Sequence, residues 1–274
     1  MVGPEGGAEL PDEIVLEAVI RDFRAKQQEG GHPDFQAYAG TTTVGLASLE
    51  LDEDGLPSAA SLRGQKISSE FRDSQYRNMN PSMYDPSQGD HMGALQTGGT
   101  GNGLHSVESF SQWYRDTPGV NVSTSVPIVL KRQGDSNRYV FDSGSDAPYS
   151  DIGGFFPIDG ELYGNYAYGH NFHFTTMIET EFMYDADIEQ VFKFTGDDDV
   201  WVYIGGQLVI DLGGLHPKRN QFLDLSRLDW LEDGETYSLK VFHAERRTTA
   251  SNFRIETTLN LRRIELPLTS ALYD

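Results

Sequence analysis

The sequence predicts an all-β chain that folds as an antiparallel β-sandwich with one or two short helices and long loops. Residues 252–261 alternate apolar and polar side chains, which is the pattern of a strand with one buried face. Gly205 and Gly206 separate two apolar runs, which predicts a two-residue hairpin. Further short runs are bounded by Gly and Asp, as is typical of the strands of a sandwich.

The first predicted strand lies in residues 12–30, which contain the run EIVLEAVIRDF. Ile14, Leu16, Ala18 and Ile20 alternate with polar or small residues, and this period of two indicates a strand. A helix is the alternative, because Ala, Glu and Leu are abundant here. The alternation favours the strand.

A long segment rich in Gly, Asn, Ser and Pro covers residues 73–103. Loops of this length inside a compact domain are uncommon and are usually functional or disordered. Tyr76, Met79, Met83 and Tyr84 offer apolar anchors, so we expect the segment to be partly ordered over the surface. It is either a binding loop or a plain insertion.

Residues 106–121 predict a short helix followed by a turn. Ser106 is a suitable N-cap residue. Phe110, Trp113 and Tyr114 have the i, i+3, i+4 spacing of one helical face. We expect this aromatic face to pack on a sheet.

The remainder of the chain is predicted to be strand and turn, without an internal repeat or a domain boundary. The candidate strands are residues 127–132, 138–142, 171–184, 190–195, 200–204, 207–211, 237–245 and 252–261. The predicted organisation is a flexible tail over residues 1–12 and a single domain over residues 13–274.

Composition limits the function classes. The chain has 42 acidic and 21 basic residues and a net charge of −21, which argues against nucleic acid and anionic membranes as partners. Such a charge suits a cation, a neutral partner or a salty medium, and solubility alone explains it equally well. The chain lacks cysteine, so disulfides and thiolate chemistry are excluded. No apolar run is long enough to span a bilayer.

Three consecutive aspartates, Asp197, Asp198 and Asp199, lie between two predicted strands. Neighbouring carboxylates repel one another, and a regular strand would direct them to opposite faces. A hard cation would remove the repulsion, and calcium prefers oxygen ligands of this kind. The alternative is a tight turn with exposed Asp side chains.

Several motifs in one order resemble the fibro-slime domain family, which is related to the PA14 domains of adhesins, toxins and carbohydrate-active proteins. The resemblance covers about residues 19–261. Its strongest motifs are FTGDDDVWVYIGGQLVIDLGGLH at 194–216 and VFHAERRTTASNFRIETTL at 241–259. Shorter ones are RDF, HPDF, SFSQWYRDTPGVN, GGFFPIDG and GHNFHFT.

The resemblance implies a PA14-like sandwich and places Asp197 and Asp198 at the acidic pair of the family pattern. In lectin members, a cis peptide joins this pair, and both carboxylates bind one Ca²⁺ that coordinates sugar hydroxyls. The present chain departs from that pattern, because Asp199 follows the pair where Gly is usual. The loop that supplies further calcium ligands in the lectins is not recognisable here.

Glu245 and Asn252 are the further candidate metal ligands, together with Asp199. The alternative for Glu245 is an ion pair with one of the arginines at 246, 247 and 254. Asp211 is expected to cap the turn towards His216.

The histidines do not predict a transition-metal site. His170 and His173 would lie on opposite faces of the strand expected there. His216 is a candidate ligand-binding residue, although hydrogen bonding to a buried carbonyl is the favoured role for both His216 and His243.

The sequence therefore predicts a non-catalytic, adhesin-type recognition module at the cell surface or outside the cell, with Ca²⁺ as cofactor and a carbohydrate as partner. Trp201 and Tyr203 are candidates for stacking on the sugar, or else belong to the core, because VWVYI is apolar on both faces. We expect any native leader or flanking domains to lie outside this sequence. A calcium-rigidified spacer module is the first alternative, and a glycan-active enzyme is the second. The sequence contains neither a nucleophile elbow, nor a phosphate-binding Gly loop followed by Lys, nor an HExxH motif.

Overall fold

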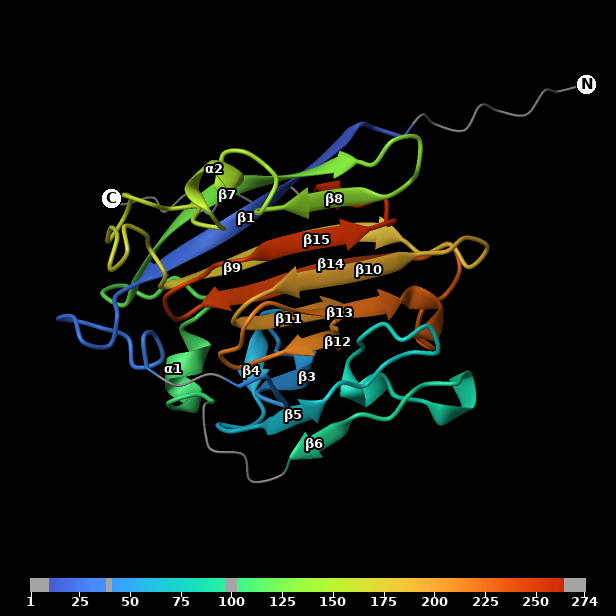
Figure 1. Ribbon diagram of the computed structural model, residues 1–274, viewed down its shortest axis with the longest axis horizontal. Helices are drawn as coiled ribbons and strands as arrows, with labels where there is room; N and C mark the ends of the chain where they lie inside the picture. Colours follow the sequence, from blue (N-terminus) through green and yellow to red (C-terminus); the bar gives the residue numbers. More distant parts are fainter. Residues whose placement is uncertain (1–9, 38–40, 97–102, 264–274) are drawn as a thin grey trace, which may run out of the picture.

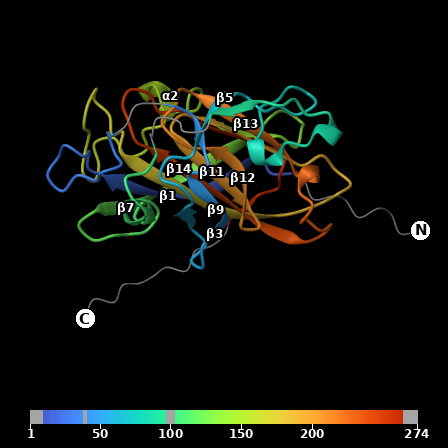
Figure 2. The ribbon, with the colours of Figure 1, turned by 90° about the horizontal axis from the view of Figure 1, so that it is seen from below.

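The computed structural model describes residues 10–37, 41–96 and 103–263. Their strands form a long antiparallel sheet that folds over on itself into two layers, with the main hydrophobic core between them. Figure 1 shows the two layers one in front of the other, and Figure 2 shows from below that β13 lies apart from β1 and β9. None of the helices in the described part of the chain has the length and apolar character to cross a membrane.

The rear layer in Figure 1 contains the longest strands. In spatial order they are β7 (Asn121–Arg132), β1 (Glu13–Phe23), β9 (Phe174–Met183), β14 (Thr236–Glu245), β11 (Asp199–Ile204) and β12 (Gln207–Leu212), followed by the short β3 (Ala47–Leu51) and β4 (Pro57–Ala59). β16 (Arg262–Arg263) pairs with β9.

The front layer continues from β7 through its pairing with β8. Its strands are β8 (Tyr139–Asp142), β15 (Phe253–Thr257), β10 (Val191–Gly196) and β13 (Arg219–Asp224). A separate small sheet contains β2 (Thr43–Val44), β5 (Gln65–Ser69) and β6 (Ala94–Gln96). The helical turns are η1 (Pro81–Met83), η2 (Pro86–Gln88), α1 (Val107–Ser111), α2 (Tyr149–Ile152) and η3 (Leu225–Arg227).

β11 is covered on both faces, which explains its uninterrupted apolar sequence. Val200, Val202 and Ile204 point into the core between the layers. Trp201 and Tyr203 point the other way into a second core, which α1 and the segments around Phe35 and Leu46 build. The predicted aromatic packing on the sheet is confirmed, because Phe110, Trp113 and Tyr114 all lie in this second core. The predicted helix was too long, since α1 ends at Ser111 and Trp113 and Tyr114 lie in the turn that follows it.

A side chain links β13, the edge strand of the front layer, to β12 in the rear layer. The Gln221 amide on β13 donates to the Asp211 carbonyl on β12 at 2.9 Å and accepts from the Asp211 N–H at 2.9 Å. Both polar groups of a fully buried glutamine are thereby satisfied. This bridge closes the sandwich beside the loop that joins β12 to β13.

The all-β class and most of the predicted elements are confirmed. Gly205 and Gly206 both have positive φ, 58° and 82°, as a type I′ hairpin turn between β11 and β12 requires. The final predicted strand was too long, since β15 ends at Thr257. β13 and the short strands of residues 43–69 were not predicted, because they are too brief or too polar to show a clear period.

Residues 73–96 of the predicted long loop carry η1, η2 and β6, so this part is ordered as expected. Residues 97–102 of that loop and residues 1–9 of the predicted tail lie outside the described part of the chain. The division into a tail and one domain stays a prediction.

Replacing Phe35 by Ala tests the second core. Phe35 is fully buried and stacks on Phe23 with ring centroids 4.3 Å apart. We expect the free energy of unfolding to fall by about 3–5 kcal/mol, because the substitution leaves a cavity. Urea denaturation measures the loss, with Met92→Ala, which is 70% exposed, as the control that stays within about 0.5 kcal/mol. A loss below about 1 kcal/mol would contradict this packing.

Candidate functional site

A pocket of about 330 Å³ opens where three connections meet at one end of the sandwich. Asp197 and Asp198 come from the β10–β11 connection, and Leu215, His216 and Pro217 come from the β12–β13 connection. Residues 247–250, between β14 and β15, complete the lining. These connections lie at the left end of the molecule in Figure 1.

Asn252, which the sequence predicted to be a further metal ligand beside Asp197, holds the Asp197 side chain in place. The Asn252 side-chain amide donates to Asp197 Oδ2 at 2.8 Å, and the Asn252 backbone N–H donates to Oδ1. Burial raises the pKa of Asp197 above its ordinary value, although these hydrogen bonds oppose the shift. Asn252 thus fixes the direction of one carboxylate of the pair.

The backbone changes direction sharply at Asp198, which two consecutive carboxylates require in order to face the same pocket. Its φ is 56°, in the left-handed region that Asp tolerates better than most residues. The cis peptide bonds in the described residues are Ala147–Pro148 and Thr248–Thr249, so the bond between Asp197 and Asp198 is trans. In this respect, the chain differs from the lectin pattern that the resemblance implied.

Asp199 does not line the pocket with the other two aspartates. Its Oδ2 accepts from Arg246 Nε at 2.6 Å, and its Oδ1 accepts from Arg246 Nη2 at 3.0 Å and from the Gly214 N–H at 2.6 Å. Both Asp199 and Arg246 are completely buried. Asp199 is therefore a structural ion-pair partner of Arg246, and the proposed role as metal ligand does not fit its position.

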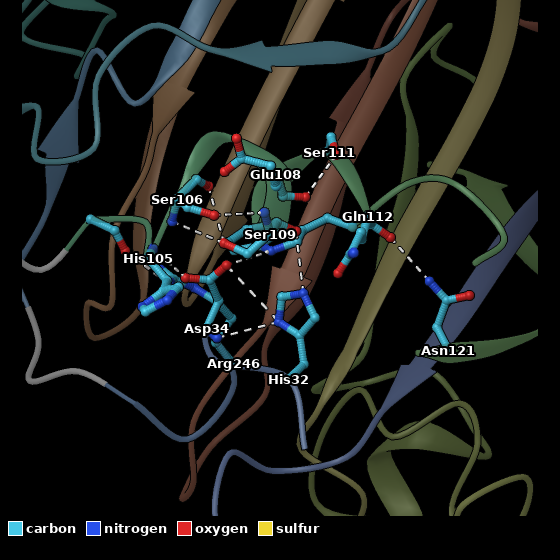
Figure 3. Close-up of polar contacts among 12 residues, drawn as sticks. His32, Asp34, His105, Ser106, Glu108, Ser109, Ser111, Gln112, Asn121 and Arg246 are labelled. Atoms are coloured by element: carbon cyan, nitrogen blue, oxygen red, sulfur yellow. Dashed lines mark hydrogen bonds and ion pairs between the residues drawn. The ribbon is translucent and has the colours of Figure 1, made fainter. Parts of the chain in front are cut away.

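Arg246 connects the triplet to α1. Its guanidinium carbon lies 4.8 Å from the centre of the Trp113 ring. Burial acts against its charge, but Asp199 and then Asp34 raise the pKa of Arg246 above its usual value. Figure 3 shows Asp34 and Arg246 close together beside the start of α1.

The surroundings of Arg246 hold α1 in place (Figure 3). Asp34 accepts from the His105 N–H at 2.6 Å and from Trp113 Nε1 at 3.2 Å. His32 Nε2 lies 3.2 Å from the Ser109 carbonyl. The helix itself starts with a capping box between Ser106 and Ser109, as the predicted Ser106 cap requires. The position of α1 is therefore coupled to the charges below the pocket.

Glu245 lies at the end of β14, next to the aspartate pair. It is completely buried, and its Oε2 has no hydrogen-bond partner among the described residues. Burial, and then the carboxylates of Asp198 and Asp197, raise the pKa of Glu245 well above its ordinary value. Two of its three proposed partners pair elsewhere, Arg246 with Asp199 and Arg254 with Asp142 and Glu256.

Asp198 is buried close to other carboxyl groups, while Arg247 also lines the pocket. Burial, and then the Asp199 carboxylate, raise the pKa of Asp198 to about 7. Arg246 forms its side-chain ion pair with Asp199 and gives Asp198 only a backbone N–H, at 2.9 Å. A divalent cation fits this environment. It would neutralise the carboxylates of Asp197 and Asp198, and its charge would stabilise the buried Glu245 oxygen that has no hydrogen-bond partner among the described residues.

The acidic side chains alone do not make a complete metal centre. Within residues 10–37, 41–96 and 103–263, no three His, Asp or Glu side chains are arranged as a metal-binding group. Calcium takes six to eight oxygen ligands, including carbonyls, hydroxyls and water. Any ion at Asp197 and Asp198 would therefore need further oxygens from the backbone, from Thr248 or Thr249, or from a ligand.

The histidines have structural environments. Both ring nitrogens of His216 lie 3.0 Å from carbonyl oxygens, those of Leu212 and Pro217, as the structural interpretation predicted. His243 Nδ1 faces the Thr176 hydroxyl at 3.3 Å, and the Asp197 backbone also offers the ring a hydrogen bond, which agrees with the structural role expected for His243. Burial lowers the pKa of His243 to about 3.

His170 and His173 precede β9 instead of lying in it, so the expected strand placement was wrong. His170 pairs with Asp159 at 2.5 Å, whereas His173 contacts the Gln36 side chain at 3.1 Å. The two rings have different partners, in agreement with the expectation that they do not share a site.

Trp201 and Tyr203 cannot stack on a ligand at the surface, because both are fully buried. Trp201 Nε1 donates to Asp211 at 3.0 Å, and the Tyr203 hydroxyl donates to the Ser48 carbonyl at 2.7 Å. Their assignment as ligand-stacking residues was wrong, and the core alternative is confirmed. Asp211 accepts from Trp201 and from the Gly45 N–H and so joins two segments, and a further hydrogen bond from the Gly213 N–H agrees with the expected cap of the turn towards His216.

The sequence analysis missed the wall formed by residues 247–250 and the role of Arg246. The motif HAERRTTASNF contains both, but Glu245 and Asn252 were the only candidate metal ligands predicted from it. A run of small polar residues directly after a long strand was the available signal, since such connections often line sites.

Comparison with known families identifies the class of protein. Residues 159–269 match the PA14 domain, a stretch that covers less than half of the chain and includes Asp197, Asp198 and Glu245. This stretch is therefore PA14-related, and the predicted resemblance is confirmed at this level.

Protein psiQ and Protein psiC of Dictyostelium discoideum are similar to this chain, with 39% and 36% identity over 171 residues each. The match covers 58% of this chain and 16% of psiQ, and 59% of this chain and 31% of psiC. The chain thus spans less than a third of the length of these relatives.

Among solved structures, the beta-glucosidase of Kluyveromyces marxianus in complex with glucose matches with a TM-score of 0.23 and 16% identity. The match covers 31% of this chain and 11% of that one. A likeness this slight supports no conclusion about fold or function.

Replacing Arg246 by Met tests the buried ion pair. We expect the free energy of unfolding to fall by about 3–5 kcal/mol, because Asp199 is left as an uncompensated buried charge. Urea denaturation measures the loss. The double variant Asp199→Asn/Arg246→Met should lose less than the sum of the two single variants, since they share one interaction.

Arg254→Met is the matched control. Arg254 also pairs with two carboxylates, but its side chain is 32% exposed, so its loss should cost about 1 kcal/mol or less. Equal losses of unfolding free energy for Arg246→Met and Arg254→Met would contradict the expectation that the buried ion pair matters more for stability than the partly exposed one.

Proposed function

We propose that this chain is a non-catalytic recognition module that binds Ca²⁺ through Asp197 and Asp198 and, through the ion, a carbohydrate. The observation that carries the proposal is the pair of adjacent, buried carboxylates that line a pocket of about 330 Å³. Burial raises both pKa values, and for Asp198 the Asp199 carboxylate adds to the shift, so a cation would stabilise the ionised form of both groups. The PA14 relationship supports an extracellular or cell-surface recognition module of the adhesin type.

The chain's own residues would hold the ion and shape the site. Asn252 positions Asp197, and the Arg246 N–H positions Asp198. When bound, calcium would supply coordination positions that two neighbouring sugar hydroxyls can take. The walls contributed by Thr248 and Thr249 offer polar groups for the remainder of the sugar.

A binding role suits the spacing of the carboxyl groups better than catalysis does. Glycosidases place two carboxyl groups about 5–9.5 Å apart on opposite sides of a scissile bond. Asp197 and Asp198 are consecutive residues at one wall of the pocket. We therefore propose a carbohydrate partner that is bound and released unchanged.

A spacer module is the second candidate function. The observation that favours it is the continuous set of contacts from Asp198 through Arg246 to Trp113 on the α1 side. Through this path, a bound calcium ion would rigidify the end of the sandwich even without a sugar ligand.

Calcium titration of chelator-stripped protein tests the proposed function. We expect saturable one-site binding by calorimetry, weakened at least about tenfold in Asp198→Asn, because one anionic ligand is lost. Asn tolerates the left-handed backbone of this position, so the variant should fold. Asp187→Asn, at an exposed turn residue, is the control that should bind like the wild type.

A glycan array in calcium and in chelator then separates the two candidates. Binding that is lost with calcium supports recognition, whereas a calcium-dependent melting temperature without any glycan binding supports the spacer. Absence of saturable calcium binding in the wild type would refute both the metal site and the carbohydrate proposal.

The raised pKa of Asp198 predicts an opposite pH dependence for stability and for calcium affinity. Without metal, the folded state retains a proton on Asp198 that the unfolded chain releases, so stability falls as the pH rises from about 4 to about 7. We expect this decrease to be smaller by roughly 1–3 kcal/mol in Asp198→Asn. Calcium must displace the same proton, so its affinity should increase over the same pH range.

Denaturation with chelator at several pH values measures the first effect. Calorimetry in two buffers of different ionisation enthalpy measures the proton release that accompanies calcium binding. Identical pH profiles for wild type and Asp198→Asn would show that Asp198 is ionised throughout.

A further inference from the structure

A second pocket, of about 230 Å³, lies on the outer face of the front layer. Its lining consists of Tyr76, Arg77, Asn78, Lys193, Asn220 and Phe222. Lys193 lies on β10, where Phe192 and Phe194 on either side point into the core, so Lys193 faces outward. Asn220 and Phe222 lie on the neighbouring β13, where Phe222 is directly opposite Lys193.

The remaining wall comes from residues 76–78, between β5 and β6. The Phe222 N–H donates to the Asn78 carbonyl at 2.7 Å, which ties this segment to the edge of the front layer. These residues lie outside the stretch that matches the PA14 domain. The second pocket shares no residue with the first one.

The charge of the second pocket is opposite to that of the whole chain. Its lining has two cationic side chains and no carboxylate, although the chain has 42 acidic and only 21 basic residues. Lys193 has no carboxylate within ion-pair distance in the described part of the chain. Its cross-strand neighbour Glu256 pairs instead with Arg138 and Arg254. Arg77 pairs with Asp73 just outside the lining, so Lys193 is the cation of this pocket that forms no ion pair among the described residues.

Arg77 is held rigidly. Asp73 accepts from Arg77 Nε at 2.6 Å, and the guanidinium carbon lies 3.6 Å from the centre of the Phe222 ring. Among the described residues, its terminal Nη1 and Nη2 groups donate to no protein acceptor, so both remain available to a ligand. A fixed, planar guanidinium is suited to a carboxylate, because two parallel hydrogen bonds can form.

The amides in the pocket also offer donors. Asn78 Oδ1 already accepts from Arg72 Nε at 3.1 Å, which leaves its NH₂ group as the free end. The Asn220 side chain has no hydrogen bond to other described residues. Tyr76, which is 65% exposed, stacks one ring face on His91 at 4.0 Å, and Arg77 covers one face of the half-buried Phe222, so a ligand can use only the remaining surface of each ring.

We propose that this pocket binds an acidic sugar, with the carboxylate of a uronic acid on Lys193 and Arg77. The amides of Asn78 and Asn220 would donate to ring hydroxyls, and the C–H face of the sugar ring would pack against Tyr76 or Phe222. This site is independent of calcium and of Asp197 and Asp198. A chain of net charge −21 repels anions in general, so binding of a uronic acid requires a local site of this kind.

NMR titration of the whole chain with D-glucuronate, in chelator and at constant salt, tests the proposal. D-glucose tests the requirement for the carboxylate, and inorganic sulfate tests the requirement for the sugar. We expect saturable shifts of side-chain and backbone amides at Asn78 and Asn220 with glucuronate, and none with glucose. Sulfate should bind at least about tenfold more weakly than glucuronate.

Lys193→Gln should weaken glucuronate binding about tenfold or more, because a charge-assisted hydrogen bond is lost. Lys26→Gln, at an exposed lysine elsewhere, removes the same charge and should leave binding unchanged. Asp198→Asn should also bind glucuronate normally, so failure of the calcium site does not affect this test. Asn220→Ala, expected to weaken binding severalfold, tests the pocket without a change of charge.

Equal binding of glucose and glucuronate, or equal binding of sulfate and glucuronate, would overturn the acidic-sugar assignment. Unchanged glucuronate binding in both folded variants, Lys193→Gln and Asn220→Ala, would overturn the location. Melting curves of both variants establish that they fold.

Discussion

The buried ion pair between Asp199 and Arg246 is the interaction on which the functional end of the molecule depends. Both side chains are completely removed from solvent. Their desolvation is offset by the two parallel hydrogen bonds between them, by the Gly214 N–H and the Gly103 carbonyl, and by the neighbouring Asp34 carboxylate and Trp113 ring. Asp199 is the first residue of β11 and pairs opposite Ala244, two residues before Arg246. The ion pair therefore fixes where β11 begins and where β14 ends.

This constraint separates three consecutive carboxylates. Asp199 is directed inward to Arg246, Asp197 is held by Asn252, and Asp198 reverses the backbone between them with a φ of 56°. Because one aspartate takes the guanidinium, the other two remain near the pocket. Burial raises the pKa of both, and the Asp199 carboxylate raises that of Asp198 further.

Residues outside the stretch that matches the PA14 domain also build parts of the core and of the pockets. The PA14 match over residues 159–269 contains the aspartate pair and the strands that position it. Earlier segments supply α1, Phe35 and Asp34, which cover one face of β11 and surround Arg246. The segment between β5 and β6 supplies Tyr76 and Arg77 to a pocket of opposite charge. One chain thus carries an acidic and a basic pocket on different elements.

The sequence by itself determined the local features, because neighbouring residues encode them: the alternation of β1 and β15, the Gly205–Gly206 turn and the aromatic face at Phe110, Trp113 and Tyr114. It also located the Asp197–Asp198 pair and its neighbour Asn252. Only the tertiary structure decided the direction of each carboxylate, the burial of Trp201 and the pairing of Arg246 with Asp199 instead of Glu245. Those outcomes depend on contacts between segments far apart in the chain, where α1 covers β11 and β14 ends beside the triplet. Periodicity and spacing report on one segment at a time, so they carry no information about such contacts.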